Sequence, residues 1–99
     1  MKIKAKVKND IVSVKMLIKH IMETGRRKDE AGQLIPGHYI TEVLATHKGE
    51  QVFSAHLGPA VSKDPYLAFS FKGGASGDAI SVTWIDNLGE TETAEAAIK

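Results

Sequence analysis

The side chains best suited to chemistry are four histidines in a chain of 99 residues. They are His20, His38, His47 and His56, and successive histidines lie 18, 9 and 9 positions apart. Imidazole and the thioether of methionine both suit copper, so a small copper-carrying β-sandwich is one hypothesis. No two histidines have a short ligand spacing such as His-x-His, so a metal site would depend wholly on the fold. We therefore expect neither a metal nor another cofactor.

The second feature is the charged stretch HIMETGRRKDEAGQLIPGHY, residues 20–39. Its basic and acidic side chains are mixed, and no aromatic residue lies among the basic ones. A nucleic-acid site needs a basic face, usually with stacking aromatics, so we expect no nucleic-acid partner. A mixed-sign cluster better suits docking on another protein, and the alternative is a closed loop whose charges pair locally. The candidate docking residues are His20, Met22, Glu23, Arg26, Arg27 and His38.

Residue patterns typical of enzymes are missing from the chain. It has no cysteine, which excludes disulfides, thiolate metal sites and cysteine nucleophiles. Ser54 and Ser62 do not lie in a Gly-x-Ser-x-Gly motif, and the glycines of residues 73–77 lack the Gly-Lys-Ser/Thr ending of a phosphate loop. We therefore expect no enzymatic activity.

The charge is distributed unevenly along a chain whose net charge is +1. Residues 1–28 carry nine basic and two acidic side chains, a balance of +7, and residues 29–99 carry −6. Such polarity can steer a charged partner, although an ordinary solvated surface produces it too. The N-terminal MKIKAKVKND lacks the apolar run of about 7–15 residues that a secretory signal needs. No apolar run approaches the about 18–20 residues of a membrane span, so we expect neither an export signal nor a membrane partner.

The dominant hydrophobic period is two residues, which is typical of half-buried β-strands. It is clearest in residues 78–86, where Ile80, Val82 and Trp84 share one face, and it recurs in residues 11–18. Further strands are expected at residues 4–8, 38–45, 51–57, 66–71 and 90–93.

Seven short strands without an amphipathic helix predict one domain, residues 1–99, with an all-β fold. The expected architecture is an immunoglobulin-like antiparallel β-sandwich. The tail from Thr93 to Lys99 is expected to form a half-turn of helix or to fray. The predicted core between the sheets contains Phe53, Phe69, Phe71, Ile80, Val82 and Trp84.

Five motifs follow one another in the chain: residues 19–29, LIPGHYI at 34–40, GPAVSKDPY at 58–66, FKGG at 71–74 and VTWID at 82–86. Together they resemble the signature of the SoxZ family, a subunit of the thiosulfate-oxidation carrier complex. The likeness covers essentially the whole chain. It departs from the family at Ile21, where proline is frequent, and at Gly37-His38-Tyr39, where Ala-His-Phe is frequent.

The resemblance implies a function for the chain. SoxZ proteins pair with SoxY, whose C-terminal arm carries the cysteine that holds sulfur intermediates while periplasmic enzymes act on them. The resemblance therefore predicts a non-catalytic scaffold subunit that forms a heterodimer with SoxY and meets other Sox enzymes transiently. The composition agrees with this role, because a chain without cysteine cannot carry the sulfur itself. A chain without an export signal is expected to reach the periplasm together with a signal-bearing partner.

Two other functions stay open beside the carrier subunit. A copper-carrying sandwich would bind copper stoichiometrically and lose it on replacement of His20 or His38. A free-standing immunoglobulin-like binding module would be monomeric and indifferent to a carrier partner.

Overall fold

The computed structural model describes residues 1–99 and contains seven β-strands and no helix. The predicted all-β fold is confirmed, and no helix is present that could cross a membrane. The strands are β1 (Lys2–Lys8), β2 (Ile11–Leu17), β3 (Ile40–His47), β4 (Glu50–His56), β5 (Tyr66–Lys72), β6 (Ala79–Asp86) and β7 (Thr91–Ala97).

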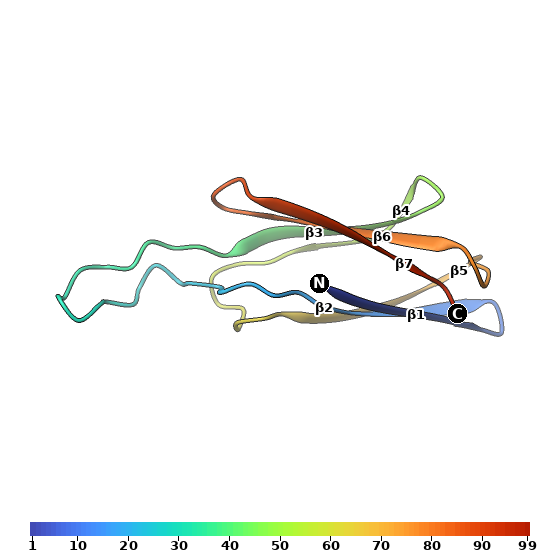
Figure 1. Cartoon of the computed structure of the whole chain (residues 1–99), viewed down its shortest axis with the longest axis horizontal. Helices are drawn as coiled ribbons and strands as arrows, with labels where there is room; N and C mark the ends of the chain where they lie inside the picture. The colour runs from blue at the N-terminus through green and yellow to red at the C-terminus, as the bar shows by residue number, and fades with distance from the viewer.

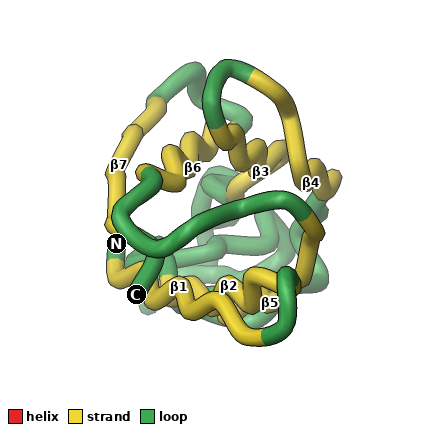
Figure 2. Tube along the Cα trace, turned by 90° about the vertical axis from the view of Figure 1, so that its right-hand side faces the viewer, coloured by secondary structure: helices red, strands yellow, loops and turns green.

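The strands form two antiparallel sheets that pack face to face. One sheet has the order β1-β2-β5 and the other β4-β3-β6-β7. The two layers are seen from the side in Figure 1 and end-on in Figure 2. This is the β-sandwich expected from the strand pattern.

The core lies between the layers, where the period-two pattern places the apolar side chains. Val12, Val14, Ile80 and Val82 have no exposed surface, and Trp84 is 8% exposed. The predicted burial of Ile80, Val82 and Trp84 on β6 is confirmed. The three predicted phenylalanines are only partly buried and pack against the core from one side: Phe53, Phe69 and Phe71.

The two lateral sides of the sandwich differ. On the β1/β7 side, the N–H of Val7 donates to the carbonyl of Lys99 and the N–H of Lys99 donates to the carbonyl of Ala5, both at 3.0 Å. These bonds link the two sheets. On the other side β4 and β5 are both edge strands, and no ladder joins them. The partly buried phenylalanines lie on these strands, so this side of the core is incompletely covered.

The C-terminal tail differs from the expectation of a helical or frayed end. Strand β7 continues to Ala97 with Ala94 opposite Val82 and Ala96 opposite Ile80. Ile98 is 1% exposed and pairs with Ala5 in a parallel bridge. The helical prediction was wrong because burial of Ile98 and pairing with β6 outweigh the helix propensity of alanine.

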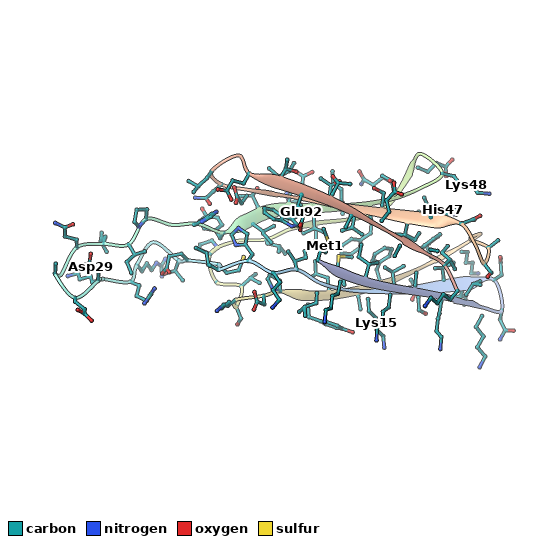
Figure 3. The ribbon with its side chains drawn as sticks, in the orientation of Figure 1. Met1, Lys15, Asp29, His47, Lys48 and Glu92 are labelled. Carbon is teal, nitrogen blue, oxygen red and sulfur yellow. The ribbon has the colours of Figure 1, made fainter.

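Lysines dominate the outer face of the three-stranded sheet. Lys4 on β1 lies directly opposite Lys15 on β2, and both are exposed. Figure 3 shows Lys15 pointing away from the other layer. Like charges directly opposite one another in an antiparallel pair are unfavourable, so this pair lowers the stability of the sheet.

Lys15→Glu is therefore expected to raise the free energy of unfolding by about 0.2–1 kcal/mol, because repulsion of Lys4 becomes attraction. Urea unfolding at low salt measures the gain. Lys72→Glu makes the same change of charge opposite the uncharged Ile11 and serves as the control. An equal gain in both variants would assign the effect to net charge instead.

The chain between β2 and β3 forms a long projection, which we call the arm, residues 20–39. Figure 1 shows it extending beyond the end of both sheets. It accounts for an elongated molecule, whose dimensions are 55 × 20 × 16 Å. Asp29 is labelled at its far end in Figure 3.

Candidate functional site

The arm is an ordered hairpin of two antiparallel segments. At its base the N–H of Glu23 donates to the carbonyl of His38 at 2.7 Å, and the N–H of His38 donates to the carbonyl of Glu23 at 2.9 Å. Farther out, the N–H of Ile35 donates to the carbonyl of Arg27 at 2.8 Å. Backbone pairing therefore gives the arm a defined shape along its length.

Local sequence explains the close approach and the tip of the arm. Gly25 has a φ of +83°, and a Cβ at this position would lie 3.3 Å from the Cα of Gly37. Glycine allows both the positive φ and the close approach of the two segments, because it has no Cβ. At the tip, Oδ1 of Asp29 accepts the N–H groups of Ala31 and Gln33 at 2.9 and 3.0 Å. Asp29 is thus occupied in forming the turn.

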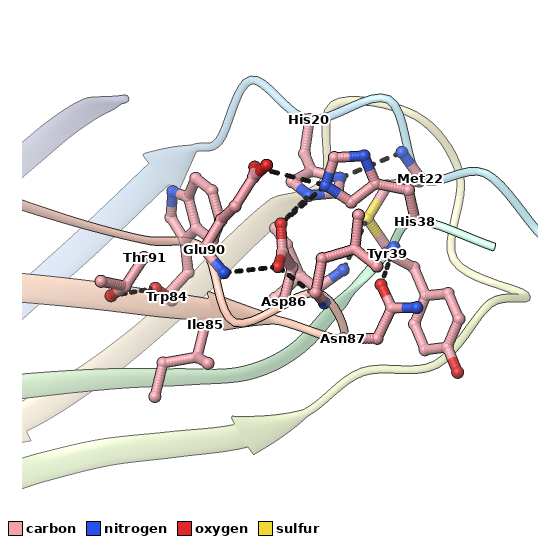
Figure 4. Close-up of polar contacts among 12 residues, drawn as sticks. His20, Met22, His38, Tyr39, Trp84, Ile85, Asp86, Asn87, Glu90 and Thr91 are labelled. Atoms are coloured by element: carbon pink, nitrogen blue, oxygen red, sulfur yellow. Dashed lines mark hydrogen bonds and ion pairs between the residues drawn. The ribbon is translucent and has the colours of Figure 1, made fainter. Parts of the chain in front are cut away.

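Asp86, at the end of β6, joins both segments of the arm to the sandwich (Figure 4). Its Oδ2 accepts hydrogen bonds from Nε2 of His20 at 3.1 Å and from Nε2 of His38 at 2.8 Å. Its Oδ1 accepts the backbone N–H groups of Leu88 at 3.0 Å and Glu90 at 2.9 Å. The carboxylate is fully enclosed. We call His20, His38 and Asp86 the clamp.

The tautomer of His20 follows from its second hydrogen bond. The backbone N–H of Met22 donates to Nδ1 of His20 at 3.1 Å, so Nδ1 presents its lone pair. The ring proton therefore lies on Nε2, where it faces Asp86. His20 is a neutral donor held in one tautomer. His38 has a more open setting, because its side chain is 22% exposed, against 4% for His20. Its Nε2 also lies 3.4 Å from Oε2 of Glu90.

Two opposing effects act on the pKa of Asp86. Burial raises this pKa, but the hydrogen bonds from His20 and His38 lower it, and the N–H groups of Glu90 and Leu88 add to the lowering. The pKa of Asp86 consequently lies at about 2, below the ordinary 3.8. The clamp therefore contains an ionised carboxylate that is stabilised by four donors.

Acid should remove the stabilisation that the ionised Asp86 carboxylate gives to the fold. Because the pKa of Asp86 is lower in the folded than in the unfolded chain, the carboxylate stabilises the fold above about pH 4 and stops doing so between about pH 4 and 2. The expected loss is about 2 kcal/mol. Urea unfolding across this range measures it. Asp86→Asn cannot titrate there, so its stability should depend less on pH, and identical pH profiles would contradict the prediction.

Asn87 fixes the returning segment of the arm next to the clamp. Its Oδ1 accepts the N–H of Tyr39, and its Nδ2 donates to the carbonyl of Gly37, both at 2.9 Å. The ring of His20 meets that of Trp84 edge to face, with the centroids 5.2 Å apart. The consecutive residues Asp86 and Asn87, at the end of β6, therefore hold both segments of the arm.

Three of the six candidate docking residues lie at the base of the arm and point inward. His20 and Met22 are 8% and 5% exposed, and the His38 side chain is 22% exposed. Met22 has a φ of +49°, and its Sδ accepts the N–H of Ile40 at 3.4 Å. Such a φ is uncommon outside glycine and requires support from the surroundings. These three side chains position the arm and offer little surface to a partner.

Of the other three candidates, Glu23 pairs with His38 at the base of the arm, and Arg26 and Arg27 lie farther out. Arg27 donates from Nε and Nη2 to the two carboxylate oxygens of Glu23 at 3.0 and 2.9 Å. This hydrogen bonding lowers the pKa of Glu23 and raises that of Arg27. Arg26 and the neighbouring Lys28 are exposed, and neither takes part in an ion pair. The arm thus carries one local ion pair and two free cations.

The remaining histidines lie apart from the clamp. Nε2 of His47 donates to Oδ2 of Asp78 at 2.8 Å, and this bond and the N–H of Ala75 hold the pKa of Asp78 below its usual value. His56 is exposed at the end of β4. The fold therefore brings only His20 and His38 together, with ring centroids 4.7 Å apart.

The clamp has the residue types of a metal site, but its hydrogen bonds do not suit one. His20, His38 and Asp86 each place one possible ligand atom within 4.8 Å of the others. A metal on Nε2 of His20 would replace the proton that this nitrogen carries. Because Nδ1 already accepts the N–H of Met22, the ring would then be an imidazolate. The copper hypothesis gains no support from this geometry.

Sequence reasoning missed Asp86 and Asn87, although a signal for Asp86 was present. Asp86 continues the inward alternation of Ile80, Val82 and Trp84, so the strand pattern places its carboxylate on the core face. An acidic residue at such a position requires hydrogen-bond donors, and histidines are natural partners. Asn87 follows no comparable periodicity.

Comparison with known families decides which kind of protein carries this arm. The family model described as sulphur oxidation protein SoxZ matches residues 1–97. The chain belongs to the SoxZ family. The resemblance inferred from the motifs is confirmed, and SoxZ membership gives the chain a role in sulfur oxidation. Among curated proteins, none matches the chain.

Proposed function

We propose that this chain is the non-catalytic scaffold subunit of a SoxYZ sulfur carrier. It pairs with the cysteine-arm subunit SoxY and helps to present the sulfur intermediates bound there to other Sox enzymes. The chain has no cysteine, and the buried titratable groups of the clamp bond to one another and to backbone N–H groups. Both facts suit a scaffold better than an enzyme. In this proposal it works in the periplasm after export with its partner.

The incompletely covered β4/β5 side carries the pairing proposal. Two unpaired strand edges meet there, and the rings of Phe53 and Phe69 stack between them with centroids 4.5 Å apart and an interplanar angle of 10°. Leu57, Val61 and Leu67 are also only partly buried. Stable heterodimers bury roughly 1,200 Å² or more around an apolar centre, and this side offers one. We assign it to SoxY.

The arm supplies a separate docking element. It projects beyond the sheets, and its base is fixed by the clamp and Asn87, so Arg26 and Lys28 are held away from the sandwich. Arginine can bind a carboxylate or an oxyanion with two parallel hydrogen bonds. An anionic sulfur adduct or an acidic side chain of an enzyme is therefore a suitable contact for the arm.

Copurification tests the pairing. A tagged chain expressed with SoxY should retain it, and mixing the purified subunits should shift both to one larger species in size-exclusion chromatography. If the tagged chain retains no SoxY and the mixture shows no shift, the carrier-subunit proposal is wrong. Stoichiometric copper uptake that is lost in His38→Ala would instead support the copper-carrying function.

Arg26→Glu together with Lys28→Glu should slow transfer between SoxY and a Sox enzyme by roughly tenfold, because the two free cations are reversed. Arg27 is left in place, since its change would break the ion pair with Glu23. Lys48→Glu/Lys63→Glu changes the net charge equally and is the control. It removes only the contact of Lys48 with Asp78, which is 3.7 Å long and involves a 70% exposed lysine, so little stability should be lost. Sulfur turnover by the reconstituted heterodimer is measured, and an unchanged rate would argue for a purely structural arm.

A further inference from the structure

The outer face of the sheet β1-β2-β5 carries charges that the proposed pairing does not use. Its outward residues on β1 are all lysine, and β2 and β5 add one lysine each. No acidic residue points outward from these three strands. We call this surface the lysine face, and its lysines are Lys2, Lys4, Lys6, Lys8, Lys15 and Lys72.

No intramolecular partner neutralises the lysine face. The single lysine in an ion pair is Lys48, which lies in the turn between β3 and β4. The repulsion between Lys4 and Lys15 is retained across the centre of the face. A groove of about 750 Å³ runs along β1, where Ser13 and Ala97 are small and Lys99 adds a further cation. The shape and charge together suit an extended acidic surface.

The spacing on β1 is regular. Alternate residues of a strand are about 6.6–6.8 Å apart, so the row from Lys2 to Lys8 extends over roughly 20 Å. Lysine is a strongly hydrated point charge on a flexible stem and is depleted in the cores of stable interfaces. This face therefore suits rapid, reversible contact better than permanent pairing, which the apolar β4/β5 side can provide.

A protein partner fits better than the other polyanions. Single-stranded nucleic acid is bound by aromatic side chains that alternate with basic ones, and the face has one aromatic, Tyr66, at its margin. A membrane surface would favour apolar residues at the centre for insertion. The exposed Ile11 and Tyr66 instead lie at opposite ends of the face, whose centre contains Ser13, Lys15 and Ala68.

We propose that the lysine face is an electrostatic docking surface for the acidic faces of the Sox enzymes that act on the carrier. This inference rests on the proposed carrier function and adds a second contact region, distinct from the arm and from the SoxY side. Charge attraction raises the rate of encounter, and hydrated lysines allow fast release. Both properties suit a carrier that visits several enzymes in turn.

The test reverses the charges of two lysines that lie directly opposite one another on β1 and β2, in the variant Lys4→Glu/Lys15→Glu. The reversed pair keeps a like-charge repulsion across β1 and β2, so stability should change little. Stopped-flow association with each purified Sox enzyme is measured for the heterodimer and for the chain alone. The association rate constant should fall about tenfold or more at about 20 mM salt, and the difference should nearly vanish at about 500 mM.

Lys48→Glu/Lys63→Glu is the matched control, since either pair changes the net charge from +1 to −3. It should slow association much less. Equal slowing by both pairs, or no effect of the lysine-face pair on any enzyme, overturns the proposal. So does a finding that the reversal abolishes binding to phosphatidylglycerol vesicles or to a single-stranded DNA oligomer while enzyme association is unchanged. Size-exclusion chromatography of the same samples reports SoxY pairing separately, so the carrier function can fail or stand independently.

Discussion

Asp86→Asn should lower the free energy of unfolding by about 2–4 kcal/mol, among the largest effects of any single substitution in this chain. The asparagine oxygen can still accept the N–H groups of Leu88 and Glu90. Its NH₂ group would face the Nε2 protons of His20 and His38, so donors would oppose donors. His38 can change its tautomer, but His20 cannot without losing the bond from Met22.

The same variant should loosen the arm before it affects the sheets. Amide hydrogen exchange should accelerate within residues 20–39, while β3 and β6 remain protected. Asp78→Asn is the matched control because Asp78 also accepts a histidine, His47, but lies at the partly exposed far end of the sandwich. The free energy of unfolding should change less in Asp78→Asn than in Asp86→Asn. Equal losses in the two variants, with no change in arm exchange, would show that Asp86 does not organise the arm.

Phe69→Ala should weaken the heterodimer with SoxY by about 30-fold or more in Kd, which corresponds to about 2 kcal/mol. Phe69 stacks on Phe53 at the incompletely covered side, where a partner would bury both rings. Aromatic side chains at the centre of an apolar interface are frequent energetic hot spots. Titration calorimetry with purified SoxY measures the change.

Tyr66→Ala is the control for this loss of affinity. Tyr66 is an aromatic residue on the same strand, but it is 60% exposed and points away from the core. Its removal should leave Kd within about threefold, as for most peripheral positions. Circular dichroism checks that both variants keep the β-sheet signal. A folded Phe69→Ala protein with unchanged affinity would move the SoxY interface away from the β4/β5 side.

The clamp orders the arm, and this order would favour the docking contact proposed for it. A free loop of twenty residues would lose much conformational entropy on binding. Backbone pairing from Glu23 to Ile35 and the bonds to Asp86 order the arm beforehand. Arg26 and Lys28 can then contact a partner at a lower entropic cost. Acid titration of Asp86 would reverse this advantage below about pH 4.

Strand positions could be predicted from the sequence more completely than the site. The alternation of Ile80, Val82 and Trp84 with polar residues is a local property, and burial of one face follows directly from it. The tail was predicted less well, because its alanines favour helix locally while pairing with β6 decides the outcome. For the charged stretch, the residue types could be identified, but not their division into inward and outward groups.

By itself the sequence determined the all-β pattern, excluded cysteine chemistry and contained the motifs of the SoxZ family. These properties depend on residue type and short-range order. Only the tertiary structure decided that His20 and His38 hold Asp86 and that the arm extends from this point. His20 and Asp86 are 66 positions apart and lie on segments that continue different sheets. Their contact depends on how the two layers pack, and the period of either strand alone cannot specify that packing.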